Sequence, residues 1–243
     1  MKNDIVYFVK NTDENEELVY SLRSVDKNFP HNKVWFFGGC PNGLKPDVHV
    51  PVVQDKGSKY QNVREMIWCA INNPDLSDNF YLFNDDFFVM SKVSYVVPAV
   101  NGSLYFLIRK LNDKYGKTYK KPYRQRLSNT VEALKRMNKD CLNYELHIPM
   151  LINKEKAKRI FNAFDNTVAF RSSYGNYYGI ARAIHPDVKI IDDDKTYDPD
   201  IHNVFLSSSD YTWNYGLVGD YVRSKFPEPS RFEVRYSRET QPL

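Results

Sequence analysis

The sequence predicts an α/β fold in which a mainly parallel sheet is flanked by helices on both faces. Short runs rich in β-branched and aromatic residues, such as DIVYFV at 4–9, alternate with longer segments whose apolar residues recur at helical spacing. The strand-like runs are continuously apolar, which is typical of strands buried on both faces of a parallel sheet. We therefore expect a Rossmann-like arrangement of alternating strands and helices.

The first half of the chain follows this alternation closely. Leu18, Leu22 and Val25 fall on one face of a predicted helix, and Pro30 ends it. The expected elements are, in chain order, a strand at 4–9, a helix at 16–28, strands at 33–37 and 48–53, a helix at 58–72 and a strand at 80–83.

After Met90 the alternation is lost. Gly116 and Pro122 favour a loop for the basic and aromatic segment 109–126. Further helices are expected at 127–138 and 154–164, and a further strand at 188–191. We expect a single domain over residues 1–243, with a core at about 4–180 and an irregular, Tyr-rich extension at about 181–243.

Composition excludes several classes of protein. The chain of 243 residues is 42% hydrophobic and 26% charged, which is usual for a globular protein and unlike disordered or collagen-like chains. No window approaches the roughly 18 consecutive apolar residues of a membrane span. The first residues lack the apolar stretch of a secretory signal, and the three cysteines form no metal-site pattern. A reducing, cytoplasmic location is expected.

Positive charge is concentrated in one segment. Residues 109–126 hold eight Lys or Arg against one Asp, whereas the whole chain has a net charge of only +4. Such a local field indicates an anionic partner, and the interleaved tyrosines suit a nucleic acid. A solvated loop with no partner is the simpler interpretation.

Two adjacent carboxylates directly follow a predicted buried strand. Asp85 and Asp86 come after Asn84, at the carboxyl end of the strand at 80–83. Ligands bind at that end of the strands in open α/β sheets. A divalent cation, Mg²⁺ or Mn²⁺, is the natural partner of such a pair, together with the phosphates of a ligand. The alternative is a turn whose acids cap a helix or face water.

Two further residues have the chemistry of a transferase site. His147 lies in the apolar stretch YELHIPMLI and has the right side chain for a general base or acid. Arg171, in TVAFRSSYGN, could clamp a phosphate with its planar guanidinium. A buried structural histidine and a surface ion pair are the respective alternatives.

Six blocks of the sequence resemble a known family in their order and spacing. They are ELVYSLRSV (17–25), FPHNKVWFF (29–37), KYQNVREMI (59–67), LSDNFYLFNDDFFVM (76–90), ELHIPMLINKE (145–155) and VAFRSSYGN (168–176). Together they resemble the conserved blocks of the Stealth family. Its members transfer sugar-1-phosphate from a nucleotide-sugar donor and include capsular polysaccharide phosphotransferases and the lysosomal-enzyme GlcNAc-1-phosphotransferase.

The resemblance implies a fold similar to the GT-A type of nucleotide-sugar transferases and a metal-dependent site. Asp85 and Asp86 would bind Mg²⁺ or Mn²⁺, and Asp86 would also belong to the catalytic centre. His147 would act as a base or as an intermediate carrier of the transferred group.

The resemblance also implies residues that contact the donor. Arg171 and Arg126 would hold the diphosphate, and Asn129 completes an Arg-x-x-Asn pattern with Arg126. Asn62 occupies the polar position of the 59–67 block. Arg23 lies in the first block, where a structural role is the alternative.

The chain departs from the family at its start, because the glycine motif and long insertion that usually precede the first block are absent. Plain glycosyl transfer is therefore an open alternative to phosphosugar transfer. A non-enzymatic binder of an anionic polymer and a transferase-like fold without activity are two further alternatives.

Overall fold

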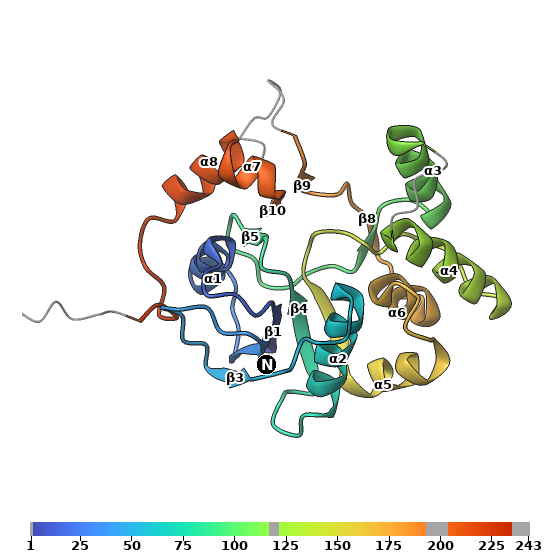
Figure 1. The fold of residues 1–243 in the computed structure, drawn as a ribbon, viewed down its shortest axis with the longest axis horizontal. Coiled ribbons are helices and arrows are strands. Elements are labelled where there is room, and N and C mark those ends of the chain that lie inside the picture. The colour runs from blue at the N-terminus through green and yellow to red at the C-terminus, as the bar shows by residue number, and fades with distance from the viewer. Residues whose placement is uncertain (1, 117–121, 193–203, 235–243) are drawn as a thin grey trace, which may run out of the picture.

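A five-stranded sheet lies at the centre of the protein (Figure 1). The structure is a computed structural model that describes residues 2–116, 122–192 and 204–234. Along the sheet the strand order is β3-β2-β1-β4-β7. The strands are β1 (Asp4–Val9), β2 (Val34–Gly38), β3 (Val48–Val50), β4 (Asn79–Phe83) and β7 (Met150–Asn153). The first four are parallel and β7 is antiparallel to β4, which confirms the mainly parallel α/β class.

Helices cover both faces of this sheet because successive strand residues point to opposite sides. Val6 and Leu82 belong to a core shared with α2, α4, α5 and α6, whereas Tyr7 and Phe83 belong to a core shared with α1. The helices are α1 (Glu16–Asn28), α2 (Lys59–Asn72), α4 (Pro122–Arg136), α5 (Lys154–Ala163) and α6 (Phe170–Tyr178). The predicted helices at 16–28, 58–72 and 154–164 are confirmed to within a residue.

A second, smaller sheet and two helices contradict the expected irregular C-terminal part. The strands are β5 (Phe87–Val89), β9 (Lys189–Ile190) and β10 (Phe205–Ser208), and the helices are α7 (Asp210–Asn214) and α8 (Leu217–Lys225). Phe88, Trp213 and Val222 form a separate apolar core there. For the described residues 204–234, the prediction of irregular structure is therefore wrong.

The basic segment is also different from the expected loop. Helix α3 (Leu104–Tyr115) occupies its first part, and α4 begins at Pro122 rather than at residue 127. Gly116, with φ +83°, is the C-cap of α3, and Pro122 is the first residue of α4. Glycine after a helix and proline at the first helical position are common helix boundaries. Residues 117–121 lie outside the described residues.

Other differences concern short elements. β3 ends at Val50 rather than at residue 53, and neither α6, which contains Arg171, nor β7 was among the expected elements. β6 (Ala99–Val100) and β8 (Ala183–Ile184) form a two-stranded parallel pair. No helix of the described chain has both the length and the apolar character needed to cross a membrane.

One glycine allows the ends of β1 and β2 to lie close together. Gly38 has φ +111°, and a Cβ atom there would lie 2.2 Å from the carbonyl oxygen of Val9. The same position faces the side chain of Gln54, whose amide nitrogen, Nε2, donates to that carbonyl over 2.8 Å. The chain after β3 is thereby fixed against the end of β1.

Candidate functional site

A cavity of about 980 Å³ opens at the carboxyl ends of the parallel strands. Phe8 of β1 and Asn11 beyond it line the cavity, as do Gln54 after β3 and Asn84 and Asp85 after β4. This is the edge at which α/β sheets bind their ligands. The remaining wall comes from α2, α4, α5 and α6.

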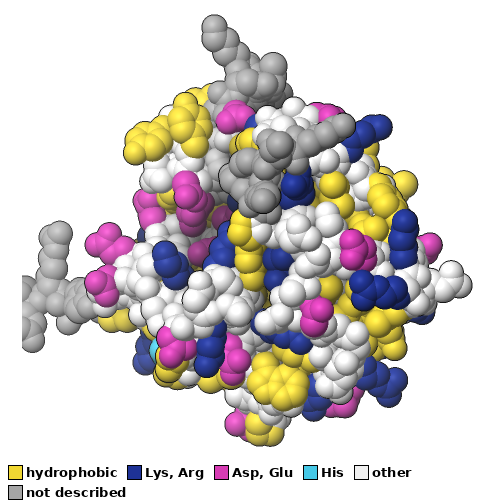
Figure 2. All heavy atoms as spheres, turned by 45° about the vertical axis from the view of Figure 1, so that its right-hand side comes forward, with side chains coloured by type: hydrophobic (Ala, Val, Ile, Leu, Met, Phe, Trp, Pro, Cys, Tyr) yellow, Lys and Arg dark blue, Asp and Glu magenta, His cyan; other side chains and the backbone are white. Residues whose placement is uncertain are grey.

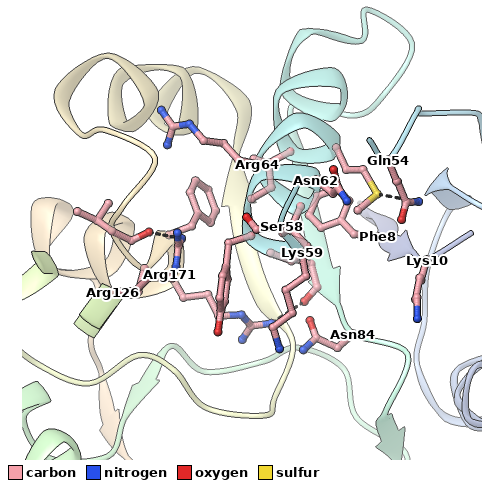
Figure 3. Close-up of a pocket in the computed structure, with 18 of the residues that line it drawn as sticks. Phe8, Lys10, Gln54, Ser58, Lys59, Asn62, Arg64, Asn84, Arg126 and Arg171 are labelled. Atoms are coloured by element: carbon pink, nitrogen blue, oxygen red, sulfur yellow. Dashed lines mark hydrogen bonds between the residues drawn. The ribbon is translucent and has the colours of Figure 1, made fainter. Parts of the chain in front are cut away.

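The cavity lining is more basic than acidic. Its basic side chains are Lys10, Lys59, Arg64, Arg126 and Arg171, and its carboxylates are Asp55, Asp85 and Glu145. Figure 3 shows Lys59 reaching from the first turn of α2 toward Asn84, with Arg126 and Arg171 on one side and Lys10 on the other. On the face in Figure 2, several Lys and Arg side chains lie beside apolar ones near the middle of the molecule. A concave wall with excess positive charge favours an anionic ligand.

Arg171 is held in the cavity wall by backbone carbonyl groups. Its Nη1 donates to the carbonyl oxygens of Leu146 over 3.0 Å and Ile148 over 2.7 Å, and its Nη2 donates to that of Leu82 over 3.3 Å. Burial lowers the pKa of Arg171, an effect that the negative charge of Glu145 opposes. A guanidinium has five N–H groups, so two of them are left for a ligand.

Arg126 is held in a similar way from α4. Its Nη1 donates to the carbonyl oxygen of Asn166 over 2.6 Å, and its Nη2 donates to that of Val168. The guanidinium carbon lies 4.5 Å from the ring centroid of Tyr60, so the ring fixes the plane of the group. Burial lowers the pKa of Arg126, again against the charge of Glu145.

Arg64, on α2, donates to three carbonyl groups at the end of α5. The acceptors are Asp165 at 3.1 Å, Phe161 at 3.3 Å and Phe164 at 3.1 Å. The guanidinium also lies over the ring of Phe161, 4.2 Å from its centroid.

These three arginines share one electrostatic property. In the described part of the chain, none of Arg64, Arg126 and Arg171 forms an ion pair with a carboxylate. Neutral carbonyl groups position the guanidinium groups without cancelling their charge. Guanidinium groups without a carboxylate at ion-pair distance, at a partly buried site, favour binding of an anion such as a phosphate.

Asp85 is the acidic group of the cavity that follows β4. Its Oδ2 accepts a hydrogen bond from Nδ2 of Asn15 over 2.8 Å. Burial, and the neighbouring charge of Asp86, raise the pKa of Asp85. Among the described residues Asp85 forms no ion pair, and such a carboxylate fits a divalent cation, which can take one or two carboxylates and complete its shell with phosphates and water. Across the described residues, no three His, Cys, Asp or Glu side chains are grouped as metal ligands.

Asp86 faces the smaller sheet instead of the cavity. Its Oδ2 lies 2.7 Å from Nζ of Lys189 and 3.0 Å from Oγ of Ser207. These contacts neutralise its charge within the protein. The two adjacent acids therefore have different surroundings.

A third carboxylate, Glu17, lies near this pair. Its Oε1 accepts from Oγ of Ser208 over 2.5 Å. Burial is the largest cause that raises its pKa to about 7, with further contributions from the charges of Asp86 and Asp85. The sequence does not show that Glu17 lies near Ser208, Asp85 and Asp86, because these residues are far from it along the chain.

His147 does not line the cavity. Its Nδ1 lies 3.0 Å from Oδ1 and 2.9 Å from Oδ2 of Asp187, and its ring meets the edge of Phe87 at a centroid distance of 6.0 Å. The side chain is 27% exposed.

The other predicted residues divide between the cavity and its surroundings. Asn62 lines the cavity and accepts from the backbone N–H of Lys56 over 3.0 Å. Asn129 is outside the lining, with its Nδ2 3.5 Å from the carbonyl oxygen of Thr167. The cavity therefore brings together Asp85, Arg126, Arg171 and Asn62, and leaves out Asp86, His147, Asn129 and Arg23.

Arg23, on α1, bonds to the C-terminal segment of the described chain. Its Nε and Nη2 donate to the carboxylate of Glu233 over 2.9 and 2.6 Å, and its Nη1 donates to the carbonyl oxygens of Phe226 and Pro227. These bonds attach the C-terminal segment to α1. These contacts agree with a structural role for Arg23, the alternative to donor binding that the sequence left open.

Several cavity residues were not singled out from the sequence. Lys59 and Arg64 belong to the 59–67 block, directly after Ser58, which caps α2 by accepting from the N–H of Gln61 over 3.3 Å. Because serine is a common N-cap residue, Ser58 could have indicated from the sequence that Lys59 lies at the start of a helix. Glu145 also lies in a block quoted above. It accepts from the backbone N–H of Ser172 in the first turn of α6 over 2.9 Å.

Comparisons with known proteins give structural neighbours only. No family model and no curated protein matches the sequence. The apo form of the glycosyltransferase GlyE from Streptococcus pneumoniae TIGR4 superposes with a TM-score of 0.30 and 8% identity, over 54% of this chain and 43% of that one. A second structure of the same glycosyltransferase has a TM-score of 0.35 and 8% identity, over 93% of this chain and 50% of that one. The chain spans about half the length of these structures.

Proposed function

We propose that the protein is a nucleotide-sugar transferase whose donor binds in the cavity at the carboxyl ends of β1, β3 and β4. The observation that carries this proposal is the set of three guanidinium groups around the cavity that have no carboxylate partner among the described residues. A diphosphate supplies the missing negative charge. The volume of about 980 Å³ is within the range of small-molecule and cofactor sites.

The donor diphosphate is proposed to contact Arg126, Arg171 and Lys59. The two arginines have N–H groups left over and are already held in place, so little side-chain entropy is lost on binding. Asn62 and Gln54 offer amide groups to the remaining, less charged parts of the donor.

A divalent cation, Mg²⁺ or Mn²⁺, is proposed to bind at Asp85, whereas Asp86 remains paired with Lys189. When bound, such an ion supplies positive charge to the phosphate that leaves with the nucleotide. The raised pKa of Asp85 supports this assignment, because a nearby cation would offset the effect of burial and of Asp86.

The transfer of sugar-1-phosphate is the preferred reaction. The oxygen of an acceptor hydroxyl attacks the phosphorus next to the sugar, the bond between the two phosphates breaks, and a nucleoside monophosphate leaves. His147 is proposed to take the proton of the hydroxyl. Glycosyl transfer is the alternative: it breaks the bond between the sugar C1 and its oxygen and releases a nucleoside diphosphate.

The acceptor is proposed to be anionic. Arg109 and Lys110 are exposed on α3, within the basic segment 109–126. If binding of an anionic polymer were the main function, affinity for it would fall steeply with salt and would not respond to EDTA.

A thermal-shift panel of UDP-, GDP-, CMP- and TDP-sugars, with and without Mn²⁺, tests the proposal. The correct donor raises the melting temperature by mass action, and more so with the metal ion. Mass spectrometry of the released nucleotide then separates the two reactions, since a monophosphate indicates phosphosugar transfer and a diphosphate indicates glycosyl transfer. A chain that neither binds nor turns over any of these donors would contradict the proposal.

A further inference from the structure

We propose that Asp187 is a positioning residue that holds the His147 ring with its Nε2 lone pair available to accept the proton of the acceptor hydroxyl. The inference rests on the proposed function and adds a residue to it. Asp187 lies 40 residues beyond His147, and no sequence pattern links the two.

The carboxylate of Asp187 holds both the backbone and the ring of His147. Its Oδ1 accepts from the backbone N–H of His147 over 3.0 Å, and its two oxygens lie 3.0 and 2.9 Å from Nδ1. A side chain bonded at both places cannot rotate freely about its first two torsions. Asp187 therefore fixes the direction in which the ring points.

The charge of Asp187 decides which ring nitrogen carries the proton. Burial raises the pKa of Asp187, but the hydrogen bonds from the ring and backbone of His147 outweigh burial, and the pKa lies below its ordinary value. An ionised carboxylate can only accept hydrogen bonds. Nδ1 must then carry the proton, and the lone pair of the neutral imidazole is on Nε2.

The second ring nitrogen of His147, Nε2, carries no hydrogen bond in the described structure. The side chain is 27% exposed. The edge-on ring of Phe87 contacts the imidazole without offering it a polar atom.

Arg171 connects this pair to the cavity. The guanidinium donates to the carbonyl groups of Leu146 and Ile148, which flank His147 in sequence, and it lies 5.3 Å from the centroid of the Phe87 ring. The same arginine lines the cavity. Arg171, the proposed diphosphate clamp, is thus bonded to the backbone on both sides of the proposed base.

In the proposed step a phosphoryl group moves from one oxygen to another and one proton moves to the imidazole. The acceptor oxygen forms a bond to phosphorus while its proton moves to Nε2 of His147. The bond between phosphorus and the bridging oxygen breaks, and its electron pair leaves with the nucleoside monophosphate. The imidazolium is stabilised by Asp187 and returns its proton to water after the product leaves.

The test combines NMR of the wild-type chain with kinetics of Asp187→Asn. Nitrogen-15 correlation spectra are expected to show His147 protonated at Nδ1, and this measurement needs no substrate. In D187N the amide oxygen still accepts hydrogen bonds but the charge is lost. We expect turnover to fall about 100-fold with the KM for the donor changed less than about twofold.

The exposed Asp75 provides a matched control. D75N makes the same chemical change at a side chain that forms no hydrogen bond among the described residues, where only the backbone N–H of Asp75 is bonded. We expect D75N to leave turnover unchanged. Protonation at Nε2 in the wild type, or normal turnover in a folded D187N, would overturn the role of Asp187. Absence of donor turnover in the wild type would instead overturn the proposed function, and the NMR result would still decide how Asp187 holds the ring.

Discussion

Nζ of Lys189 lies 2.7 Å from Oδ2 of Asp86, and this ion pair joins the end of β4 to the smaller sheet. The lysine side chain is 24% exposed and the aspartate side chain 12%. Because the pair is largely buried, each charge depends on the other for compensation. The charge of Asp86 is thereby compensated by Lys189 within the protein, whereas the adjacent Asp85 lines the cavity.

We predict that D86N and K189M each destabilise the fold. Removing one member of a buried pair leaves the other charge uncompensated, and the free energy of unfolding should fall by about 3 kcal/mol. The double variant should be more stable than the sum of the single effects predicts. Urea unfolding of the four proteins measures the coupling, and strictly additive losses would show that the two charges do not interact.

We predict that stability falls with rising pH because of Glu17. Its pKa is about 7 in the folded chain, against an ordinary value of 4.5. Between these two values the folded chain holds a proton that the unfolded chain releases, so the free energy of unfolding decreases as pH rises through this window. E17Q removes this loss, and its melting temperature should exceed that of the wild type at pH 8 but not at pH 4. The exposed Glu14 gives the control variant E14Q, which should keep the wild-type dependence.

We predict that R126Q weakens binding of the nucleotide diphosphate. The neutral amide loses a charge-assisted contact, and the Kd of UDP or of the identified donor should rise about tenfold or more. R126K keeps the charge but not the planar fork, so its affinity should be intermediate. Calorimetric titration measures both, with the exposed Arg159 on α5 changed to Gln as the control. Unchanged affinity in folded R126Q would remove this arginine from the donor site.

We predict that R23M reduces stability without reducing donor affinity. The bidentate contact with Glu233 and the carbonyl contacts attach the C-terminal segment, and their loss should cost about 2 kcal/mol. E233Q should show a similar but smaller loss. Chemical unfolding and calorimetric titration separate the two effects, and weaker donor binding by folded R23M would return Arg23 to the donor site.

The sequence predicts the elements whose pattern is local. The apolar run at 4–9 and the spacing of Leu18, Leu22 and Val25 are sufficient for β1 and α1, and FYLF followed by Asn84 places the acids at a strand end. The loop predicted from Gly116 and Pro122 was wrong because a glycine and a proline mark helix boundaries as readily as they mark loops. The local sequence pattern does not show whether such residues lie within a loop or mark the end of one helix and the start of the next.

The site is less predictable because its contacts are between distant segments. Arg126 and Arg171 line the cavity, yet the carbonyl groups that hold them cannot be identified from the sequence. The pairing of Asp86 with Lys189 spans 103 residues. Only the folded chain distinguishes Asp86 from Asp85, since both follow the same strand.

The turn between α5 and α6 accepts hydrogen bonds from arginines on two other helices. Arg64 bonds to carbonyl groups at Phe164 and Asp165, and Arg126 bonds to those at Asn166 and Val168. An inserted or deleted residue here would shift the acceptors of both side chains at once. Evolution can therefore vary the side chains of this turn far more easily than its length, and homologues should differ there by substitution without gaps.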